Sequence, residues 1–288
     1  MKASTFVPGH ISTVFRPVRG ASPIETGSLG LGIRLSSGCR AAVSRRDDMD
    51  VRIIVNGAET EAPVTRKAVE MMGTDTGFDI FLEHDLPLQQ GFGASASGTY
   101  AATLCVAELA GLDRTRAIES THVAECDLGG GLGDLLAIDS EFGVPVRYVA
   151  GPPRISGRTR DSGLSFDRLS LVVFDQPLPT KSVLGNPGMM SRIIDAGDRA
   201  LEVFSEDCSI DGLFRASNMF SESIGIESDD IRNGMDSIRS EGYHAGMCML
   251  GNSIFSDAPM EVIKRLFPGR RTFSSSSFSG PIKVETTG

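Results

Sequence analysis

The chain has 288 residues, enough for one large domain or two ordinary ones with a substantial core. Its hydrophobic fraction of 40% and charged fraction of 23% are typical of a soluble globular protein. A formal net charge of −9, with no basic stripe to offset it, argues against nucleic acid or an anionic membrane as a partner. The chain has no tryptophan, so stacking platforms for single-stranded nucleic acid are not expected either.

Cysteine usage and the N-terminal residues indicate the cellular compartment. The five cysteines are scattered along the chain, and no two of them form a Cys-x-x-Cys pair. This pattern is typical of reduced thiols in a cytoplasm. The first residues, MKASTFVPGHIS, lack the apolar run of a signal peptide, and no apolar run is long enough to span a membrane. We therefore expect a soluble cytoplasmic protein.

The first half of the chain predicts strands and glycine turns, followed by helices. Short β-leaning segments separated by turn residues occur at 4–7, 32–35, 38–43, 51–55 and 78–83. The Ala- and Leu-rich run 96–110 predicts a helix that ends at Gly111. Asp113 is expected to cap a second helix that ends near Cys126, and a short helix is expected over 132–139.

The second half predicts a different mixture of elements. A strand is expected at 144–149, a Gly-Pro-Pro breaker follows it, and the run LSLVVF at 169–174 predicts a buried strand. Helices are then expected at 189–204, 212–224 and 228–240, and strands at 245–250 and 282–284. The breaker and the composition around it predict an N-terminal domain over 1–155 and a C-terminal domain over 156–288.

The most informative stretch is PLQQGFGASASGT, residues 87–99, which runs directly into the first predicted helix. Gly91 and Gly93 lack a Cβ, so the backbone can turn tightly and approach a ligand closely. The free N–H groups and the positive dipole end at a helix start favour an anion such as phosphate. The stretch is neither a Walker A loop nor a complete Rossmann fingerprint, because Ala96 occupies the third glycine position. Simple close packing of the two glycines is the alternative.

Hydroxyl and carboxyl groups near this loop suggest a chemistry. Ser95 and Ser97 lie in the first turn of the helix, where a hydroxyl can coordinate Mg²⁺ beside phosphates. His122 and Glu125 share one face of the second helix, and Asp134 follows a glycine-rich loop. Either this is a solvated helix face with a capping aspartate, or one carboxylate binds a metal while the other accepts a proton from a substrate hydroxyl. No second histidine completes a zinc site.

Two further glycine motifs flank these features along the chain. PGHIS, residues 8–12, follows the first predicted strand and reads as a turn. HAGMCMLGN, residues 244–252, reads as a strand flanked by glycines. The second motif can bring the backbone close to a phosphate, or its glycines can serve tight packing alone.

Taken in order, these motifs resemble the three motifs of the GHMP kinase superfamily. Within it, the stretches FVPGHIS, SPIETGSLGLGIRLSSG, PLQQGFGASASGT, THVAEC, GGGLGD and MCMLGN resemble the archaeal pantoate kinases over nearly the whole chain. As in pantoate kinases, the first motif carries His10 where mevalonate kinases have a lysine. The resemblance implies an α+β fold of two domains, an N-terminal one with a left-handed βαβ unit and a C-terminal ferredoxin-like one. ATP and the substrate would bind between them.

The resemblance also implies roles for particular residues. The ATP phosphates would be wrapped by Gly91, Phe92, Gly93, Ala94, Ser95, Ala96 and Ser97. Ser95 and Glu125 fall at the positions of the superfamily's Mg²⁺-binding serine and glutamate. Asp134 falls where mevalonate-kinase-type members keep the catalytic aspartate that accepts the proton of the attacking hydroxyl, although homoserine kinases lack it. The third motif has fewer glycines than the superfamily pattern, and Gly246 is its candidate phosphate contact.

The implied reaction is transfer of a phosphoryl group from ATP, with Mg²⁺, to the primary hydroxyl of pantoate. The product would be 4-phosphopantoate, which feeds coenzyme A synthesis. Pantoate carries one carboxylate and two hydroxyls, so its site needs a cation and hydrogen-bond donors. The candidates are Ser28, His10, His122, Arg147 and Thr180. A guanidinium can pair bidentately with a carboxylate, which favours Arg147 over the rival cation Lys181, but a strand-edge arginine in solvent is the alternative.

Three other functions stay open at this point. The chain could be a GHMP kinase for another small alcohol, such as homoserine, shikimate or a mevalonate derivative. It could be a non-catalytic nucleotide-binding regulator, although the presence of Ser95, Glu125 and Asp134 counts against that. It could be a dinucleotide-dependent oxidoreductase, although the missing third glycine counts against that. A homodimer is expected from the general symmetry of soluble oligomers.

Overall fold

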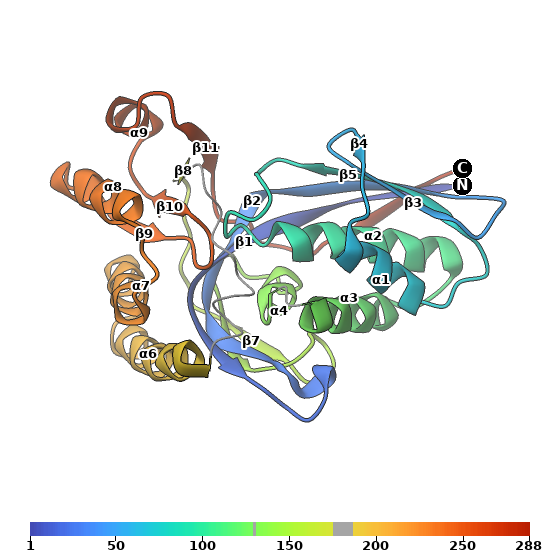
Figure 1. The fold of residues 1–288 in the computed structure, drawn as a ribbon, viewed down its shortest axis with the longest axis horizontal. Helices are drawn as coiled ribbons and strands as arrows, with labels where there is room; N and C mark the ends of the chain where they lie inside the picture. The colour runs from blue at the N-terminus through green and yellow to red at the C-terminus, as the bar shows by residue number, and fades with distance from the viewer. Residues whose placement is uncertain (129–130, 175–186) are drawn as a thin grey trace.

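The computed structural model describes residues 1–128, 131–174 and 187–288. Its strands form two sheets, and helices pack against each of them (Figure 1). The first sheet contains β1 (Lys2–Val18), β2 (Gly27–Arg45), β3 (Val51–Val55), β4 (Ala58–Glu59), β5 (Phe78–His84), β6 (Pro145–Val149), β7 (Arg158–Asp161) and β12 (Val284–Thr287). The second contains β8 (Leu169–Val173), β9 (Ala245–Met247), β10 (Ser253–Ser256) and β11 (Arg271–Ser275).

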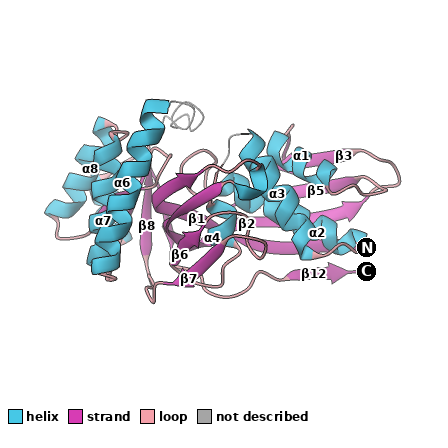
Figure 2. Ribbon diagram, turned by 90° about the horizontal axis from the view of Figure 1, so that it is seen from below, coloured by secondary structure: helices cyan, strands magenta, loops and turns pink. Residues whose placement is uncertain are grey.

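The helices fall into two groups that follow the two sheets. A short 3-10 turn, η1 (Pro23–Glu25), precedes β2, and the first group comprises α1 (Pro63–Met71), α2 (Ala94–Ala110), α3 (Arg114–Leu128) and α4 (Asp134–Ile138). The second group comprises α6 (Pro187–Glu206), α7 (Ile210–Ile224), α8 (Asp229–Ser240) and α9 (Met260–Leu266). Figure 2 shows α6, α7 and α8 side by side at one end of the molecule, away from α1, α2 and α3. None of the described helices is long and apolar enough to cross a membrane.

The first sheet has the order β12-β1-β2-β5-β3-β4, and β6 and β7 extend from β2. Strands β3 and β5 pair in parallel and are connected through α1, which makes a βαβ unit. Helices α1, α2 and α3 cover one face of this sheet (Figure 1). Almost every side chain of α2 is buried, because its small residues fit between the sheet and the neighbouring helices.

The second sheet is antiparallel and has the order β11-β8-β10-β9. In chain order its elements run β8, then helices α6 to α8, then β9 and β10, then α9 and β11. Numbered along the chain, the strands therefore lie in the order 4-1-3-2, which is the ferredoxin-like arrangement. The expected α+β fold, with a βαβ-containing first part and a ferredoxin-like second part, is confirmed.

Strand β1 connects the two hydrophobic cores of the protein. Ala3 and Val7 pack in the core between the first sheet and α2, whereas Ile11 and Phe15 pack in the core beneath α6 and α7. The expectation of a turn at PGHIS is wrong, because these residues lie inside β1 at a register shift between Pro8 and His10. A bulge can accommodate proline in a paired strand, since proline has no N–H to donate to the ladder.

The helix boundaries expected around α2 are close to those observed. Gly111 adopts the left-handed conformation, with φ +70°, at the end of α2, and Asp113 Oδ1 accepts the Arg116 N–H at 3.1 Å.

The division into two domains between residues 155 and 156 stays a prediction. Strands β7 and β12 both lie after that point in the sequence, yet they pair within the first sheet.

Candidate active site

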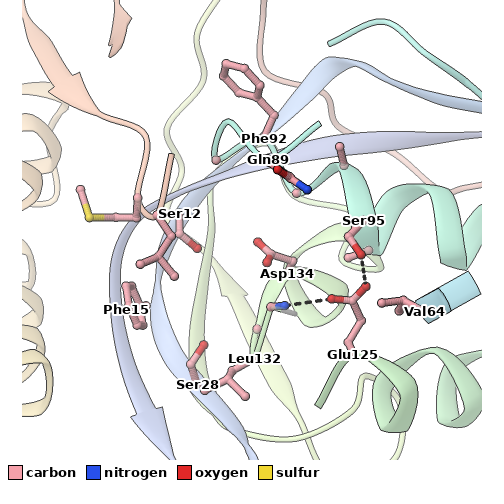
Figure 3. A pocket seen from close by; sticks show the side chains of 18 of the residues that line it. Ser12, Phe15, Ser28, Val64, Gln89, Phe92, Ser95, Glu125, Leu132 and Asp134 are labelled. Atoms are coloured by element: carbon pink, nitrogen blue, oxygen red, sulfur yellow. Dashed lines mark hydrogen bonds between the residues drawn. The ribbon is translucent and has the colours of Figure 1, made fainter. Parts of the chain in front are cut away.

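A cavity of about 310 Å³ opens where the start of α2, the loop before α4 and strands β1 and β2 meet (Figure 3). The turn between β9 and β10 contributes to it as well, so both sheets supply parts of the wall. The residues that line the cavity are Ser12, Phe15, Ser28, Val64, Gln89, Gly91, Phe92, Gly93, Ala94, Ser95, Ala96, Glu125, Leu128, Gly131, Leu132, Gly133, Asp134, Met249 and Leu250.

The glycine loop before α2 forms one wall of the cavity. Gly91 and Gly93 have φ of +79° and +61°, a region that disfavours side chains. A Cβ at Gly91 would lie 2.9 Å from the carbonyl oxygen of Cys248, so glycine also permits a close backbone contact there. The first turn of α2 has N–H groups without helical partners, and Ala94 and Ser95 of this turn border the cavity. This wall can therefore bind an anion.

Ser95 and Glu125 are brought together at the same wall. Ser95 Oγ donates to Glu125 Oε1 at 2.6 Å, and the Gly131 N–H donates to Glu125 Oε2 at 2.9 Å (Figure 3). Burial raises the pKa of Glu125 to about 7, even though the hydrogen bonds from Ser95 and Gly131 act to lower it. The sequence pattern placed Ser95 and Glu125 on separate helices, and the packing of α2 against α3 makes them neighbours.

The cavity has a negative lining and no compensating side-chain cation. Glu125 and Asp134 both border it, whereas no lysine or arginine is among its lining residues in the described part of the chain. A bound polyanion would thus be repelled unless a metal ion neutralised the site. The described residues contain no group of three or more His, Cys, Asp and Glu that could hold a metal by themselves. A hydroxyl and a carboxylate beside an anion cradle are nevertheless suitable ligands for Mg²⁺ shared with phosphate.

Asp134 lies at the start of α4, between the two ends of the cavity (Figure 3). Its Oδ1 is 2.7 Å from Nδ1 of His10, and its side chain is 22% exposed. Burial acts to raise the pKa of Asp134, but the hydrogen bond and electrostatic interaction with His10, followed by the charge of nearby Arg147, outweigh burial and lower it. Asp134 is therefore a carboxylate at neutral pH, directed at a space that can hold a hydroxyl group.

The residues that the sequence analysis expected to bind the substrate do not all line the cavity. Ser28 lines the cavity. His122 does not line it. Its Nε2 donates to the carbonyl oxygens of Pro23 and Thr26 at 2.9 and 3.0 Å, which anchors the η1 turn that precedes Ser28. His10 and Arg147 lie buried behind the cavity wall. Thr180 and Lys181, the rival cation to Arg147, lie outside the described residues.

The third motif touches the glycine loop through its second half. Gly246 faces the Phe255 ring, which a Cβ at position 246 would approach to 2.7 Å, and it is not among the residues that line the cavity. A Cβ at Gly251 would instead lie 2.2 Å from the backbone of Gln90. The sequence left tight packing open for the glycines of this motif, and Gly251 packs in this way, but the sequence did not predict Gln90 as its partner.

Sequence reasoning also missed apolar and hydroxyl groups at the far end of the cavity, which is the end away from the glycine loop and the start of α2. Ser12 and Phe15 come from β1, and Leu132 from the loop before α4 (Figure 3). No local pattern marks these residues, because their shared position depends on how β1 curves between the two cores.

Comparison with known proteins agrees with this geometry. Residues 62–140 match the model described as GHMP kinases N terminal domain. A pantoate kinase of Thermococcus kodakarensis is 28% identical to this chain over 281 residues, which cover 92% of each protein. A pantoate kinase of Methanospirillum hungatei is 27% identical over 264 residues, which cover 88% of this chain and 87% of that protein. A solved structure titled "Phosphotransferase related to CoA biosynthesis pathway" has a TM-score of 0.87 at 23% identity, with 99% of both chains covered.

The matched domain and the overall fold are those of the GHMP kinases. The relatives in this comparison that are similar along nearly the whole chain are archaeal pantoate kinases, so the resemblance seen in the motifs is confirmed.

Proposed function

We propose that this chain is a pantoate kinase that transfers the γ-phosphoryl group of ATP to the primary hydroxyl of pantoate. The observation that carries the proposal is the position of Asp134. This carboxylate lies in one cavity between an anion-binding helix start and a small end lined by hydroxyl and apolar groups. The similarity to pantoate kinases along about 90% of the chain supports the choice of acceptor.

A second cavity supports the assignment of the nucleotide. It measures about 560 Å³ and shares Val64, Gln89, Ala94 and Ser95 with the first cavity. Its other walls come from the β3–β4 turn, the start of α1 and the end of β5. A nucleoside placed there would extend its phosphates along the glycine loop toward Asp134. ATP fits this arrangement, because the GHMP kinases are ATP-dependent.

The residues around Glu125 fit a magnesium ion. Glu125 is a buried carboxylate without an ion-pair partner among the described residues, and Ser95 Oγ lies 2.6 Å from it. Both groups supply hard oxygen ligands, which Mg²⁺ prefers, and phosphate oxygens complete such sites. We propose that Ser95 and Glu125 hold the ion, which would neutralise charge on the transferred phosphoryl group.

The far end of the cavity suits pantoate in shape and polarity. Ser12 and Ser28 offer hydroxyl groups to the carboxylate and the secondary hydroxyl. Phe15 and Leu132 offer apolar surface to the two methyl groups of the branched carbon. Arg147 adds positive charge from behind the wall, and its buried Nε has no hydrogen-bond partner among the described residues.

The chemistry follows from this placement. The acceptor hydroxyl oxygen attacks the γ-phosphorus in line, its new P–O bond forms, and the bond to the β–γ bridging oxygen breaks, which releases ADP. Asp134 orients the hydroxyl and takes its proton as the O–H bond weakens. The N–H groups at the start of α2 hold the phosphates in place. Positioning of the reactants and neutralisation of the phosphate charge therefore account for most of the acceleration over the uncatalysed reaction.

An acceptor panel tests the proposal. ADP release is measured with ATP and Mg²⁺ in the presence of pantoate, homoserine, shikimate or mevalonate, and the product is identified by mass spectrometry. We expect pantoate to give the highest kcat/KM by a wide margin and to yield 4-phosphopantoate. ADP release that does not depend on pantoate, or a higher kcat/KM with another alcohol, would reject it. Absence of turnover with all acceptors would favour a nucleotide-binding regulator.

We further propose that the enzyme works in the cytoplasm as a homodimer with a domain boundary near residue 155. The five cysteines are all free thiols, as expected in a reducing compartment. Two-fold symmetry is the commonest arrangement of soluble homo-oligomers. Sedimentation analysis tests the dimer directly, since a single species of 30.6 kDa would contradict it.

A further inference from the structure

Three polar side chains form a hydrogen-bonded row that starts behind the cavity and ends in it. Arg147 Nη1 donates to His10 Nε2 at 3.2 Å, and His10 Nδ1 lies 2.7 Å from Asp134 Oδ1. His10 has no exposed surface and Arg147 is 1% exposed, whereas the Asp134 side chain is 22% exposed. The row thus ends on a carboxylate that a ligand can reach.

The hydrogen bonds determine the tautomer of His10. A guanidinium can only donate, so Nε2 of His10 must be an unprotonated acceptor. The ring proton then lies on Nδ1 and is donated to Asp134. Burial lowers the pKa of His10, and the charges of Arg147 and Arg34 lower it further, which outweighs the effect of Asp134. The imidazole is therefore neutral, between a cation and an anion.

Glycines leave the space that this row occupies. A Cβ at Gly32 would lie 2.1 Å from His10 Nε2, and a Cβ at Gly30 would lie 2.3 Å from Arg147 Nη2. A Cβ at Gly133 would lie 3.0 Å from Arg147 Nε. The glycine-rich stretch of β2 is thus accounted for by the two buried side chains that it admits.

We propose that His10 and Arg147 are positioning residues, which fix Asp134 as a carboxylate and keep its second oxygen directed at the acceptor hydroxyl. This inference rests on the proposed phosphoryl transfer. His10 engages Oδ1, so the carboxylate cannot rotate freely and Oδ2 is left for the hydroxyl. Arg147 acts through His10, because its guanidinium fixes the tautomer that can donate to Asp134.

The assignment changes the roles suggested for both residues by the motif resemblance. Both ring nitrogens of His10 have protein partners, so the ring has no donor left for pantoate. Two of the three Arg147 nitrogens already contact His10, Ser12 or the Val14 carbonyl oxygen. The two residues therefore act on the reaction through Asp134.

The tautomer can be observed in the free enzyme, without any turnover. The chain has four histidines, and long-range ¹H–¹⁵N correlation spectra distinguish Nδ1–H from Nε2–H imidazoles. His10→Asn removes one set of signals and so assigns it. We expect His10 to be a neutral Nδ1–H tautomer throughout the neutral pH range. In Arg147→Met the ring should accept a second proton at higher pH than in wild type. An Nε2–H tautomer or an imidazolium in wild type would overturn the inference.

A matched pair of substitutions tests the effect on turnover. An asparagine amide can take the place of Nδ1–H, whereas a glutamine amide can take the place of Nε2 and leaves Asp134 without its donor. We expect His10→Gln to lower kcat about 100-fold, as for a misplaced reacting group, with the KM for ATP unchanged. His10→Asn should retain most of kcat. His244→Asn is the control, since His244 pairs with Asp257 in the second sheet and should leave kcat unchanged.

The outcomes separate this inference from the proposed function. If pantoate is not the acceptor, wild type shows no pantoate-dependent ADP release, yet the tautomer of His10 is still measured. If wild type is active and His10→Gln matches it in kcat, the positioning role is overturned and the proposed function stands. Equal losses in His10→Gln and His10→Asn, with both variants folded by circular dichroism, also overturn it.

Discussion

Ser95 Oγ donates a 2.6 Å hydrogen bond to Glu125 Oε1 and thereby joins the first turn of α2 to the last turns of α3. The second carboxylate oxygen accepts the N–H of Gly131, so the group is held from two sides. Burial raises the pKa of Glu125 to about 7, which indicates an acid group in a place that lacks a cation. This relationship is the structural basis of the proposed metal site.

Removing the charge of Glu125 should impair metal use. We expect Glu125→Gln to lower kcat about 100-fold and to raise the Mg²⁺ concentration needed for half-maximal rate, because an amide is a weaker ligand for a hard cation. A coupled ADP-release assay over a Mg²⁺ titration measures both quantities. Glu119→Gln is the matched control, since Glu119 lies on the same helix with a half-exposed side chain paired to Arg116. Similar Mg²⁺ curves for the two variants would contradict the assignment.

The conformation of the glycine loop can be tested separately from its contacts. Gly91 and Gly111 have φ of +79° and +70°, so alanine costs about 1 kcal/mol of strain at either position. At Gly91 the added Cβ also meets the Cys248 carbonyl oxygen at 2.9 Å, whereas at Gly111 it meets nothing within 4 Å. We expect Gly91→Ala to raise the KM for ATP about tenfold. Gly111→Ala should lower stability only, and an equal rise in KM for both would count against the loop as the phosphate site.

Asp134 should affect turnover rather than nucleotide binding. Asparagine keeps the size of the side chain but cannot accept the proton of the hydroxyl. We expect Asp134→Asn to lower kcat by about 10² to 10⁴-fold while the Kd for ATP, measured by calorimetry, changes little. Undiminished turnover in this variant would remove Asp134 from the reaction.

Asp134 should also make stability depend on acid pH. Its native pKa lies below the ordinary value of about 3.9, so the unfolded state binds more protons in that range and stability rises with pH. The contribution is present above the unfolded pKa and is lost as the pH falls through the lower native pKa. In urea unfolding, the free energy of Asp134→Asn should therefore fall less steeply on acidification than that of wild type. Parallel pH profiles would show that Asp134 is not held as a carboxylate.

Cysteine reactivity should follow burial. The thiols of Cys39, Cys105, Cys126 and Cys248 have their pKa raised to about 12 by burial, so their thiolate forms are scarce at neutral pH. Cys208 is exposed. We expect iodoacetamide to label Cys208 in the native protein and all five thiols after unfolding, as read by mass spectrometry. Cys208→Ser should abolish native labelling, and rapid labelling of Cys248 would contradict the packing of the β9–β10 turn.

Much of the fold could be predicted because its signals are local. Helix α2 ends at Gly111 as expected, and strand β3 has the bounds that the pattern indicated. The sequence reasoning missed α1, α9, β4, β7, β10 and β11. Helices α1 and α9 span only nine and seven residues, and β4 and β7 are exposed strands with few apolar residues, so each offers only a short or weak signal. Strands of this kind form because neighbouring strands offer hydrogen bonds.

The residues of the candidate site likewise fall into those that local sequence patterns predicted and those that only the folded structure brings together. Gly91, Gly93 and Ser95 are adjacent in the chain, so spacing alone predicted an anion cradle at a helix start. Ser12, Phe15 and Leu132 meet only in the folded protein, where β1 curves between two cores. The contact of Gly251 with Gln90 likewise depends on how the second sheet packs on the first.

The sequence by itself determined the glycine loop at a helix start, the family resemblance and the candidate residues of the proposed reaction, because these depend on chain neighbours and motif order. The tertiary structure decided which side chains meet. It placed Glu125 against Ser95, and it buried His10 and Arg147 in a row that ends on Asp134. These partners come from segments far apart in the chain, and only the packing of helices and strands in a dense interior sets their distances and the tautomer of His10.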